Sequence, residues 1–265
     1  MTSRDLDQFY TKESISLELY NISKNYITDF NDYDIILEPS AGSGSFFKLF
    51  PEKQRLGLDI EPKFNDIVKQ DFFEFKPNPF LSYITIGNPP FGKNASLAIK
   101  FFNKCSEFSN YICFVVPKTF RKVSLHNKLS LNMHLIYDKE LPENSFIFND
   151  NPYNVPCCFQ IWQKATTKRK IIPPISYHTD FERVDDVSLA DFIFQRVGAR
   201  AGTLKTDNLL KWGKTSHYYI RSKIDKQLII SRFNELNFDE VKYNTAGNPS
   251  ISYSEIIRLY TDRYT

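Results

Sequence analysis

The sequence predicts an α/β fold built on a mostly parallel β-sheet that is covered on both faces. Six short apolar runs are separated by turn residues, and helix-like stretches lie between some of them. Continuous apolar runs are typical of parallel strands that are buried on both faces. The last two runs follow each other with no long helix between them. We therefore expect an antiparallel hairpin at one edge of the sheet.

The individual elements of the first part of the chain follow from periodicity. A helix is expected over residues 13–29, where apolar side chains recur at helical spacing and Ser14 is a suitable N-cap. A second helix is expected over 95–107, and a third after the loop at 38–47. The six expected strands lie within residues 33–42, 54–62, 83–92, 110–120, 133–141 and 155–164. These elements predict a first domain that covers residues 1–164.

The composition favours an ordinary globular protein, with 42% hydrophobic and 25% charged residues. No apolar run approaches the roughly 20 residues that span a bilayer. The N-terminal residues lack the apolar core of a signal peptide, so we expect a cytoplasmic protein without membrane contact. The richness in Phe, Asn and Lys is typical of an AT-rich genome, such as that of a bacterium, a phage or a large virus.

The four cysteines, Cys105, Cys113, Cys157 and Cys158, point to no special chemistry. Their spacing matches no zinc-site pattern, and two adjacent cysteines do not form a typical disulfide. Three of them lie in apolar strand-like runs. We therefore expect buried, reduced thiols and no metal site.

Residues 165–265 show a different pattern and predict a small, basic α+β region. A linker-like segment at 166–175 precedes it. A strand is then expected at 191–197, and helices at 225–234 and 251–263. This region is a candidate for target recognition.

Basic residues are concentrated at residues 193–223, where seven Lys and Arg side chains stand against one acidic residue, Asp207. Aromatic side chains such as Trp212 are interleaved with them. Arg196 and Arg200 flank a glycine turn and could clamp a phosphate. Basic residues that track phosphates and aromatic rings that stack on bases predict a surface for a nucleic acid.

The loop EPSAGSGSFF, residues 38–47, is the first candidate ligand site. It follows the first expected strand, and ligands of doubly wound sheets bind near that position. Gly42 and Gly44 would let the backbone approach a ligand closely. The spacing fits neither a P-loop nor the G-x-G-x-x-G pattern, and Glu38 is an acceptor. The loop therefore predicts a cationic or neutral ligand rather than a phosphate.

Two acidic residues further along the chain extend this site. Asp59 ends the second expected strand about 20 residues later, where a carboxylate commonly binds the ribose of a nucleoside cofactor. Asp71 and Phe72 place an acceptor beside an aromatic ring, a pair that suits an adenine. The pattern predicts a nucleoside cofactor.

The stretch Asn88-Pro89-Pro90-Phe91 follows the third expected strand. The prolines fix the backbone and push each preceding residue toward extended geometry. The Asn88 side chain and the Pro89 carbonyl would thus present acceptors to one small volume, with Phe91 as a flat face. Such acceptors could draw the hydrogens of an aromatic amine out of plane and stabilise the charge that builds on its nitrogen.

The motifs DQFYT at 7–11, EPSAGSGSF, GLDIEP, QDFFEF and NPPFG occur in the order seen in one family. The chain resembles S-adenosylmethionine-dependent N6-adenine DNA methyltransferases of the amino type, with a gamma-like motif order. The resemblance covers roughly residues 5–164. It implies a Rossmann-like class I methyltransferase fold with a seven-stranded sheet and an antiparallel edge hairpin.

The resemblance also implies roles for individual positions. The implied cofactor contacts are Tyr10, Thr11, Glu38, Pro39, Ala41, Gly42, Gly44, Asp59, Ile60, Asp71, Phe72 and Asn88. The implied catalytic stretch is Asn88, Pro89, Pro90 and Phe91, with Phe91 also stacking on the target base. An aromatic residue before the last hairpin strand should contact the target, with Tyr153 as first candidate and Phe148 as second.

The implied reaction is methyl transfer to the N6 amine of adenine in DNA, by base flipping and direct in-line attack. Such enzymes serve in DNA methylation and restriction-modification. A protein partner or a homodimer could supply part of the specificity. An RNA N6-adenine methyltransferase and a protein-glutamine N5 methyltransferase remain alternatives, because both substrates present a planar amine. A nonenzymatic cofactor-binding module is a further alternative, which the intact NPPF stretch disfavours.

Overall fold

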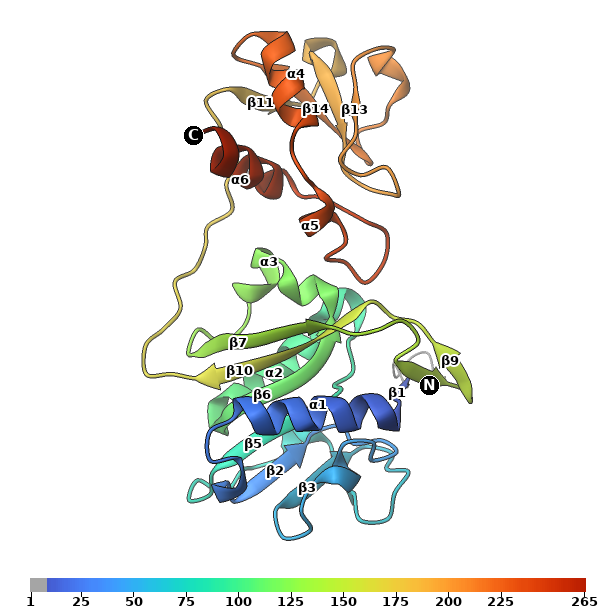
Figure 1. Cartoon of the computed structure of the whole chain (residues 1–265), viewed down its shortest axis with the longest axis vertical. Coiled ribbons are helices and arrows are strands. Elements are labelled where there is room, and N and C mark those ends of the chain that lie inside the picture. Colours follow the sequence, from blue (N-terminus) through green and yellow to red (C-terminus); the bar gives the residue numbers. More distant parts are fainter. Residues whose placement is uncertain (1–8) are drawn as a thin grey trace. The chain divides into compact units, whose positions relative to one another are not determined.

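The computed structural model describes residues 9–265, and contacts divide the chain into two units (Figure 1). The first unit extends to Ile171 and the second comprises Ile172–Thr265. The division falls within the linker-like segment at 166–175. Each unit has its own hydrophobic core, and we describe the two separately.

A seven-stranded sheet forms the centre of the first unit. Its spatial order is β4-β3-β2-β5-β6-β10-β7. The strands span Ile35–Glu38 (β2), Arg55–Asp59 (β3), Val68–Lys69 (β4), Tyr83–Gly87 (β5), Ser109–Pro117 (β6), Met133–Glu140 (β7) and Cys157–Lys164 (β10). The first five strands in this order pair in parallel, and β10 is antiparallel to both of its neighbours. The predicted Rossmann-like sheet with an antiparallel edge hairpin is thus confirmed.

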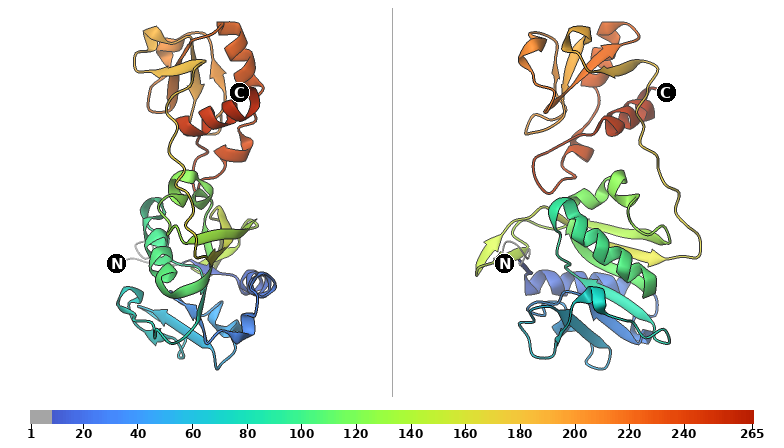
Figure 2. Two further views of the ribbon diagram at one scale, coloured as in Figure 1. Left: turned by 90° about the vertical axis from the view of Figure 1, so that its left-hand side faces the viewer. Right: turned by 180° about the vertical axis from the view of Figure 1, so that it is seen from behind.

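Helices cover both faces of this sheet. Figure 2 shows α1 (Glu13–Tyr26) and α2 (Ser96–Phe108) on opposite sides of it, and the short α3 (Val123–His126) follows β6. The strands are apolar on both faces because both faces are covered: β5 is buried along its whole length. Trp162 on β10 is 1% exposed and packs against Phe102 of α2.

The predicted N-cap at Ser14 is wrong, because α1 already begins at Glu13, two residues before the start that an N-cap at Ser14 implies. Lys12 occupies the N-cap in extended geometry, and its backbone N–H donates to the Ser145 carbonyl. The strand β1 (Tyr10–Thr11) pairs with β8 (Phe146–Phe148), so extended backbone continues through Lys12. Ser14 therefore already lies inside the helix.

The helix predicted after the glycine loop is also absent, and a single 3-10 turn at Phe47–Leu49 takes its place. Pro51 pushes Phe50 into extended geometry, with φ −77° and ψ 145°, and thereby ends the turn. Phe46, Phe47 and Phe50 are all buried. The packing of these three rings in the core therefore stabilises the segment, which is too short to form an α-helix.

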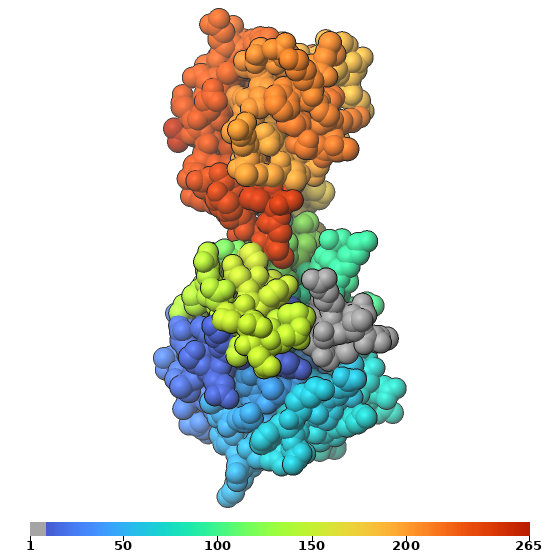
Figure 3. All heavy atoms as spheres, turned by 90° about the vertical axis from the view of Figure 1, so that its right-hand side faces the viewer, coloured from blue at the N-terminus to red at the C-terminus, as the bar shows by residue number. Residues whose placement is uncertain are grey.

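A small three-stranded sheet, which the sequence did not predict, lies beside the main one. It consists of β1, β8 and β9 (Asn151–Tyr153) in the order β1-β8-β9. The β8–β9 hairpin turns through Asn149 and Asp150, which have φ values of 47° and 60°. Two positive φ values are typical of a two-residue type I′ turn. Figure 3 shows the yellow-green hairpin at the surface of the first unit.

The second unit is an antiparallel sheet with helices, as the α+β pattern predicted. The sheet order is β11-β14-β12-β13, with strands at Phe181–Val184 (β11), Phe192–Gln195 (β12), Leu204–Lys205 (β13) and His217–Ser222 (β14). The helices are α4 (Lys226–Asn234), α5 (Asp239–Lys242) and α6 (Tyr253–Tyr264). Ser252 and Glu255 form a capping box at the start of α6.

Candidate functional site

A cavity of about 310 Å³ lies in the first unit, where β2, β3 and β5 end. Ligands of open α/β sheets bind at the carboxyl ends of the strands, and this volume is near the lower limit for such pockets. The residues predicted for the cofactor that line it are Tyr10, Thr11, Glu38, Pro39, Ala41, Gly42, Asp59, Ile60, Asp71, Phe72 and Asn88. Gly44 does not line it. The structure thus brings eleven of the twelve candidates to one cavity.

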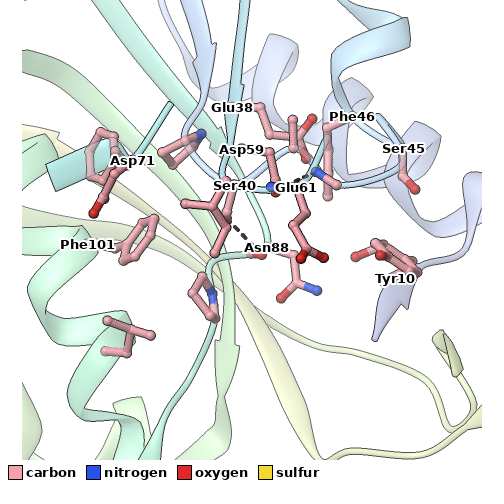
Figure 4. Close-up of a pocket in the computed structure, with 18 of the residues that line it drawn as sticks. Tyr10, Glu38, Ser40, Ser45, Phe46, Asp59, Glu61, Asp71, Asn88 and Phe101 are labelled. Atoms are coloured by element: carbon pink, nitrogen blue, oxygen red, sulfur yellow. Dashed lines mark hydrogen bonds between the residues drawn. The ribbon is translucent and has the colours of Figure 1, made fainter. Parts of the chain in front are cut away.

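The charge in this cavity is one-sided. Among the described residues that line it, the acidic side chains are Glu38, Asp59, Glu61 and Asp71, and there is no Lys or Arg. Figure 4 shows Asp71 and Phe101 at one end, Tyr10 and Ser45 at the other, and Glu61 and Asn88 between them. A cavity lined by one sign of charge favours a ligand of the opposite sign. The site is therefore suited to a cation.

The glycine loop is fixed to the end of β3. The Gly42 N–H donates a hydrogen bond of 2.7 Å to Asp59 Oδ2, and the Glu61 N–H donates one of 2.7 Å to Asp59 Oδ1. Gly42 has φ +49°, and a Cβ there would lie 2.6 Å from a ring carbon of Tyr10. Only glycine fits this bend, because a side chain would meet both backbone strain and a neighbouring ring. The Asp59 carboxylate therefore shapes the loop as well as facing the cavity.

Glu38 is a buried carboxyl group at the end of β2, with only 3% exposure. Its Oε2 accepts a 2.7 Å hydrogen bond from the Phe47 N–H. Burial raises the pKa of Glu38 well above its ordinary value, and this outweighs the hydrogen bond from Phe47, which lowers the pKa. A cation bound in the cavity would favour the ionised form of this group.

Tyr10 closes the other end of the cavity from β1. Its pKa is raised by burial and by the negative charges of Asp59 and Glu61. The phenol therefore stays neutral. The next residue, Thr11, is 4% exposed, and its Oγ1 is buried with no hydrogen-bond partner among residues 9–265. A buried hydroxyl without a partner is costly, and a polar ligand group could satisfy it.

The opposite end of the cavity suits a flat ring. The side chain of Asp71 accepts from the Phe73 N–H at 2.8 Å and caps a 3-10 turn. Phe72 is 2% exposed and stacks on Phe101 of α2, with ring centroids 4.9 Å apart. Ile60 also lines the cavity and is 49% exposed. These residues form an apolar slot with an acceptor, the Asp71 carboxylate, at its rim.

Asn88 lies directly after β5, at the centre of the cavity lining (Figure 4). Its Nδ2 donates a long, 3.5 Å hydrogen bond to the Phe9 carbonyl, whereas its Oδ1 is buried with no partner among residues 9–265. The Ser40 hydroxyl donates to the Asn88 backbone carbonyl at 3.4 Å. A buried amide oxygen without a donor costs free energy until a ligand supplies one. The site thus presents an unused acceptor.

The rest of the NPPF stretch divides between the cavity and its wall. Pro90 lines the cavity, but Pro89 and Phe91 do not. Phe91 is 7% exposed, and its ring packs edge-to-face on Phe9 with centroids 5.2 Å apart. The Phe91 ring is therefore covered by Phe9 in this structure.

The two target-contact candidates of the first unit, Phe148 and Tyr153, face each other across the β8–β9 hairpin, with ring centroids 5.4 Å apart. The Tyr153 ring also lies 5.8 Å from that of Phe9, which itself contacts Phe146 at 5.0 Å. An aromatic cluster from Phe9, directly before β1, from the hairpin and from the NPPF stretch thus lies next to Asn88. Tyr153 is 42% exposed, so the cluster is open on that side.

The other two target-contact candidates lie in the second unit. Arg196 directly follows β12, and its Nη1 donates to the Thr215 carbonyl at 2.9 Å. Its guanidinium also lies over the Tyr218 ring, 5.1 Å from the centroid. Arg200 is exposed in the turn after β12. These two residues belong to a surface of that unit and not to the cavity.

Several residues that line the cavity were not predicted from the sequence. They are Phe9, Ser40, Ser45, Phe46, Glu61, Gln70, Phe73, Gly92, Leu97 and Phe101. Glu61 stands two residues after Asp59, so its place near a strand end could have pointed to it. Phe101 lies within the helix expected at 95–107, where an apolar residue gives no sign of a ligand site. The predicted Asp7 and Gln8 of DQFYT lie outside the described residues.

The thiols take no part in this site. All four cysteines are free and buried. Burial raises the pKa of Cys113 to about 12, and it also raises the pKa values of Cys105, Cys157 and Cys158. Thiols with raised pKa values are poor nucleophiles. Among residues 9–265 there is also no cluster of three or more His, Cys, Asp or Glu that could hold a metal ion, and no helix has the length and apolar character needed to cross a membrane.

Comparison with known proteins yields structural similarity only. No protein-family model matches the chain, and no curated protein matches it. A candidate RNA methyltransferase from Pyrococcus horikoshii is 14% identical, with a TM-score of 0.46, and the match covers 60% of this chain and 88% of that one. The 23S rRNA methyltransferase ErmE is 12% identical, with a TM-score of 0.41 and coverage of 60% and 71%. A candidate methylase from Haemophilus influenzae is 16% identical, with a TM-score of 0.37 and coverage of 58% and 98%.

Proposed function

We propose that the chain transfers a methyl group from S-adenosylmethionine to the N6 amine of adenine in DNA. The observation that carries the proposal is the buried Asn88 Oδ1, which lacks a donor among residues 9–265 and lies at the end of β5 in an acidic cavity. An amine hydrogen would satisfy it. The sequence motifs, the strand order and the cavity lining support the same function.

We assign each part of the cofactor to a part of the cavity. The adenine would lie in the slot of Phe72, Phe101 and Ile60, with Asp71 accepting from its amino group. The ribose hydroxyls would face Asp59 and Glu61. The methionine end would reach Tyr10 and the buried Thr11 hydroxyl. The acidic lining favours the positive charge of the sulfonium and the ammonium.

When bound, S-adenosylmethionine supplies an electrophilic methyl group on a positively charged sulfur. The chain's own residues prepare the attacking nitrogen. Asn88 Oδ1 would accept one amine hydrogen, which helps to localise the nitrogen lone pair and stabilises the charge that builds on it. Pro89 does not line the cavity in this structure, so its carbonyl would have to turn toward the amine to accept the second hydrogen. Once it carries the methyl group, the nitrogen would lose a proton to water, and the sulfur would leave as a neutral thioether. Holding the nitrogen in line with the methyl group would raise the rate further.

The two units would have different roles in the reaction. The catalytic domain corresponds to residues 1–164, and residues 165–265 would recognise the target. The flipped adenine would enter beside the aromatic cluster of Phe9, Phe91 and Tyr153. Phe9 would have to move to expose the Phe91 ring, because it covers that ring in this structure. Arg196 and Arg200 would hold the phosphate backbone.

The test is to incubate the purified full chain with methyl-labelled S-adenosylmethionine and unmethylated duplex DNA, total RNA or protein in parallel. We expect the label in DNA, recovered as N6-methyladenine after digestion to nucleosides. Label confined to RNA would move the proposal to an RNA adenine methyltransferase, and label confined to glutamine would replace it. Asn88→Ala serves as the inactive control.

A further inference from the structure

Leu210 protrudes from the loop between β13 and β14 in the second unit. It is 84% exposed, more than any other large apolar side chain of Ile172–Thr265. It lies in a 3-10 turn at Leu209–Lys211, which begins after Asn208 in left-handed geometry with φ 49°. Burial of a leucine side chain is favourable, so this position leaves a substantial apolar contact unused.

The loop is tied to the rest of the unit by hydrogen bonds, although the Leu210 side chain itself is exposed. Three of its carbonyls accept hydrogen bonds from side chains of the neighbouring sheet. The Tyr219 hydroxyl donates to the Trp212 carbonyl at 2.7 Å, and the His217 Nδ1 lies 3.1 Å from the Gly213 carbonyl. The third bond is the one from Arg196 to Thr215. These bonds hold the part of the loop that directly follows the turn with Leu210.

Four cations of the basic segment at 193–223 have no acidic partner among the described residues. Of the seven basic residues at 193–223, Lys214, Arg221 and Lys223 form ion pairs with acidic residues of the same unit. The other four have no ion pair within residues 9–265: Arg196, Arg200, Lys205 and Lys211. Lys205 lies over the Trp212 ring, 5.2 Å from its centroid.

We propose that Leu210 is a wedge that inserts between stacked base pairs of duplex DNA, while these four cations hold the flanking phosphates. An exposed apolar loop tip, together with cations that have no acidic partner in the described chain, has the chemistry of proteins that unstack a base step. The cost of unstacking would be offset by the apolar contact and by the phosphate contacts. The proposal deepens the proposed function, on which its choice of DNA rests, because a methyltransferase must separate its target base from the stack.

The test uses the full chain and fluorescently labelled short duplexes, with binding followed by anisotropy without S-adenosylmethionine. One duplex is fully paired, and its twin carries a central A·A mismatch, in which part of the unstacking cost is already met. We expect the wild type to bind the mismatched duplex several-fold more tightly. Leu210→Ala should lose about tenfold in affinity for the paired duplex while the slope of log K against log salt stays unchanged.

Two control variants make the result specific. Leu228→Ala removes a 45% exposed leucine from the surface of α4 and should leave affinity unchanged. Lys211→Ala should reduce the salt slope by about 0.9 without changing the preference for the mismatch. The wedge is refuted if Leu210→Ala binds both duplexes like the wild type. It is equally refuted if single-stranded DNA or duplex RNA is preferred and Leu210 makes no difference. Because binding is measured without methyl transfer, failure of the proposed reaction would be seen separately, in the labelling experiment.

Discussion

The Asp59 carboxylate accepts a 2.7 Å hydrogen bond from the Gly42 backbone N–H, which ties the glycine loop to the end of the neighbouring strand. Its other oxygen accepts from the Glu61 N–H at the same distance. One side chain thus fixes two segments of the cavity wall. The position of a ligand bound to Asp59 would therefore depend on the geometry of both segments.

Asp59→Asn should weaken cofactor binding more than the loss of one ligand contact alone. The amide has only one acceptor oxygen, so one of the two backbone N–H groups loses its partner. Hydrogen bonds to charged groups contribute about 1.5–3 kcal/mol, which corresponds to a loss of about tenfold or more in affinity. Isothermal titration with S-adenosylmethionine measures the effect. An unchanged Kd would show that Asp59 neither shapes nor contacts the cofactor site.

Gly42→Ala should abolish tight cofactor binding, because the new methyl group would lie 2.6 Å from the Tyr10 ring at a backbone φ of +49°. Gly44→Ala is the matched control. It carries similar backbone strain, with φ +79°, but its nearest neighbours are at an ordinary 3.5 Å, and it does not line the cavity. We expect both variants to lose about 1 kcal/mol of stability, and only Gly42→Ala to lose cofactor affinity as well. Equal cofactor affinities in the two variants would refute a steric role for the loop.

Glu38→Gln should stabilise the ligand-free protein at about pH 8 and have less effect near pH 5. Burial raises the folded-state pKa of Glu38 above its ordinary value of 4.5, so the folded protein binds this proton more tightly than the unfolded chain. The wild type therefore loses stability as pH rises from the unfolded pKa through the folded one. A tenfold difference in proton affinity between the folded and unfolded states corresponds to about 1.4 kcal/mol of stability.

Thermal melts of the wild type and Glu38→Gln across that pH range measure the difference. The glutamine can still accept from the Phe47 N–H, so the loop should stay in place. A difference in Tm that does not grow with pH would mean that the Glu38 carboxyl is not destabilised by burial.

Asn88→Ala should lower the rate of methyl transfer by about a hundredfold or more, because it removes an acceptor that acts on the charge developing during the reaction. Cofactor affinity should stay near that of the wild type. Asn110→Ala, at the exposed start of β6, serves as the control for loss of an asparagine. Single-turnover kinetics with separately measured cofactor binding distinguish the two effects. A collapse of cofactor affinity with little change in rate would assign Asn88 to cofactor binding instead.

Tyr153→Ala should raise the KM for the nucleic acid and leave cofactor affinity unchanged, because Tyr153 lies outside the cavity but contacts Phe9 at its rim. Base stacking on an aromatic ring contributes about 1–3 kcal/mol. Phe148→Ala allows comparison with the second candidate on the same hairpin. If Phe148→Ala has the larger effect, the order of the two candidates is reversed.

The main sheet and the cavity lining could be predicted because their signals are local. β5 is a continuous apolar run that ends directly before Asn88, and Asp59 ends β3 in the same manner. Parallel strands bring such ends to one edge, so residues far apart in sequence meet without any long-range information.

The small sheet could not be predicted because it depends on a long-range pairing. β1 has two residues, and Tyr10 pairs with Ile147. Strands this short carry no periodicity, and only the Asn149-Asp150 turn gave a local signal. Phe101 was missed for a related reason: its position on a helix does not reveal that it stacks on Phe72.

The chain contains two tryptophans, and each of its two units holds one. Trp162 is sealed in the core of the first unit, whereas Trp212 lies half-buried beside His217 in the second. Emission from the first should be blue-shifted, and emission from the second should report on whatever approaches its surface. With Trp212→Phe as the companion variant, intrinsic fluorescence would separate the melting of one unit from that of the other without any attached dye.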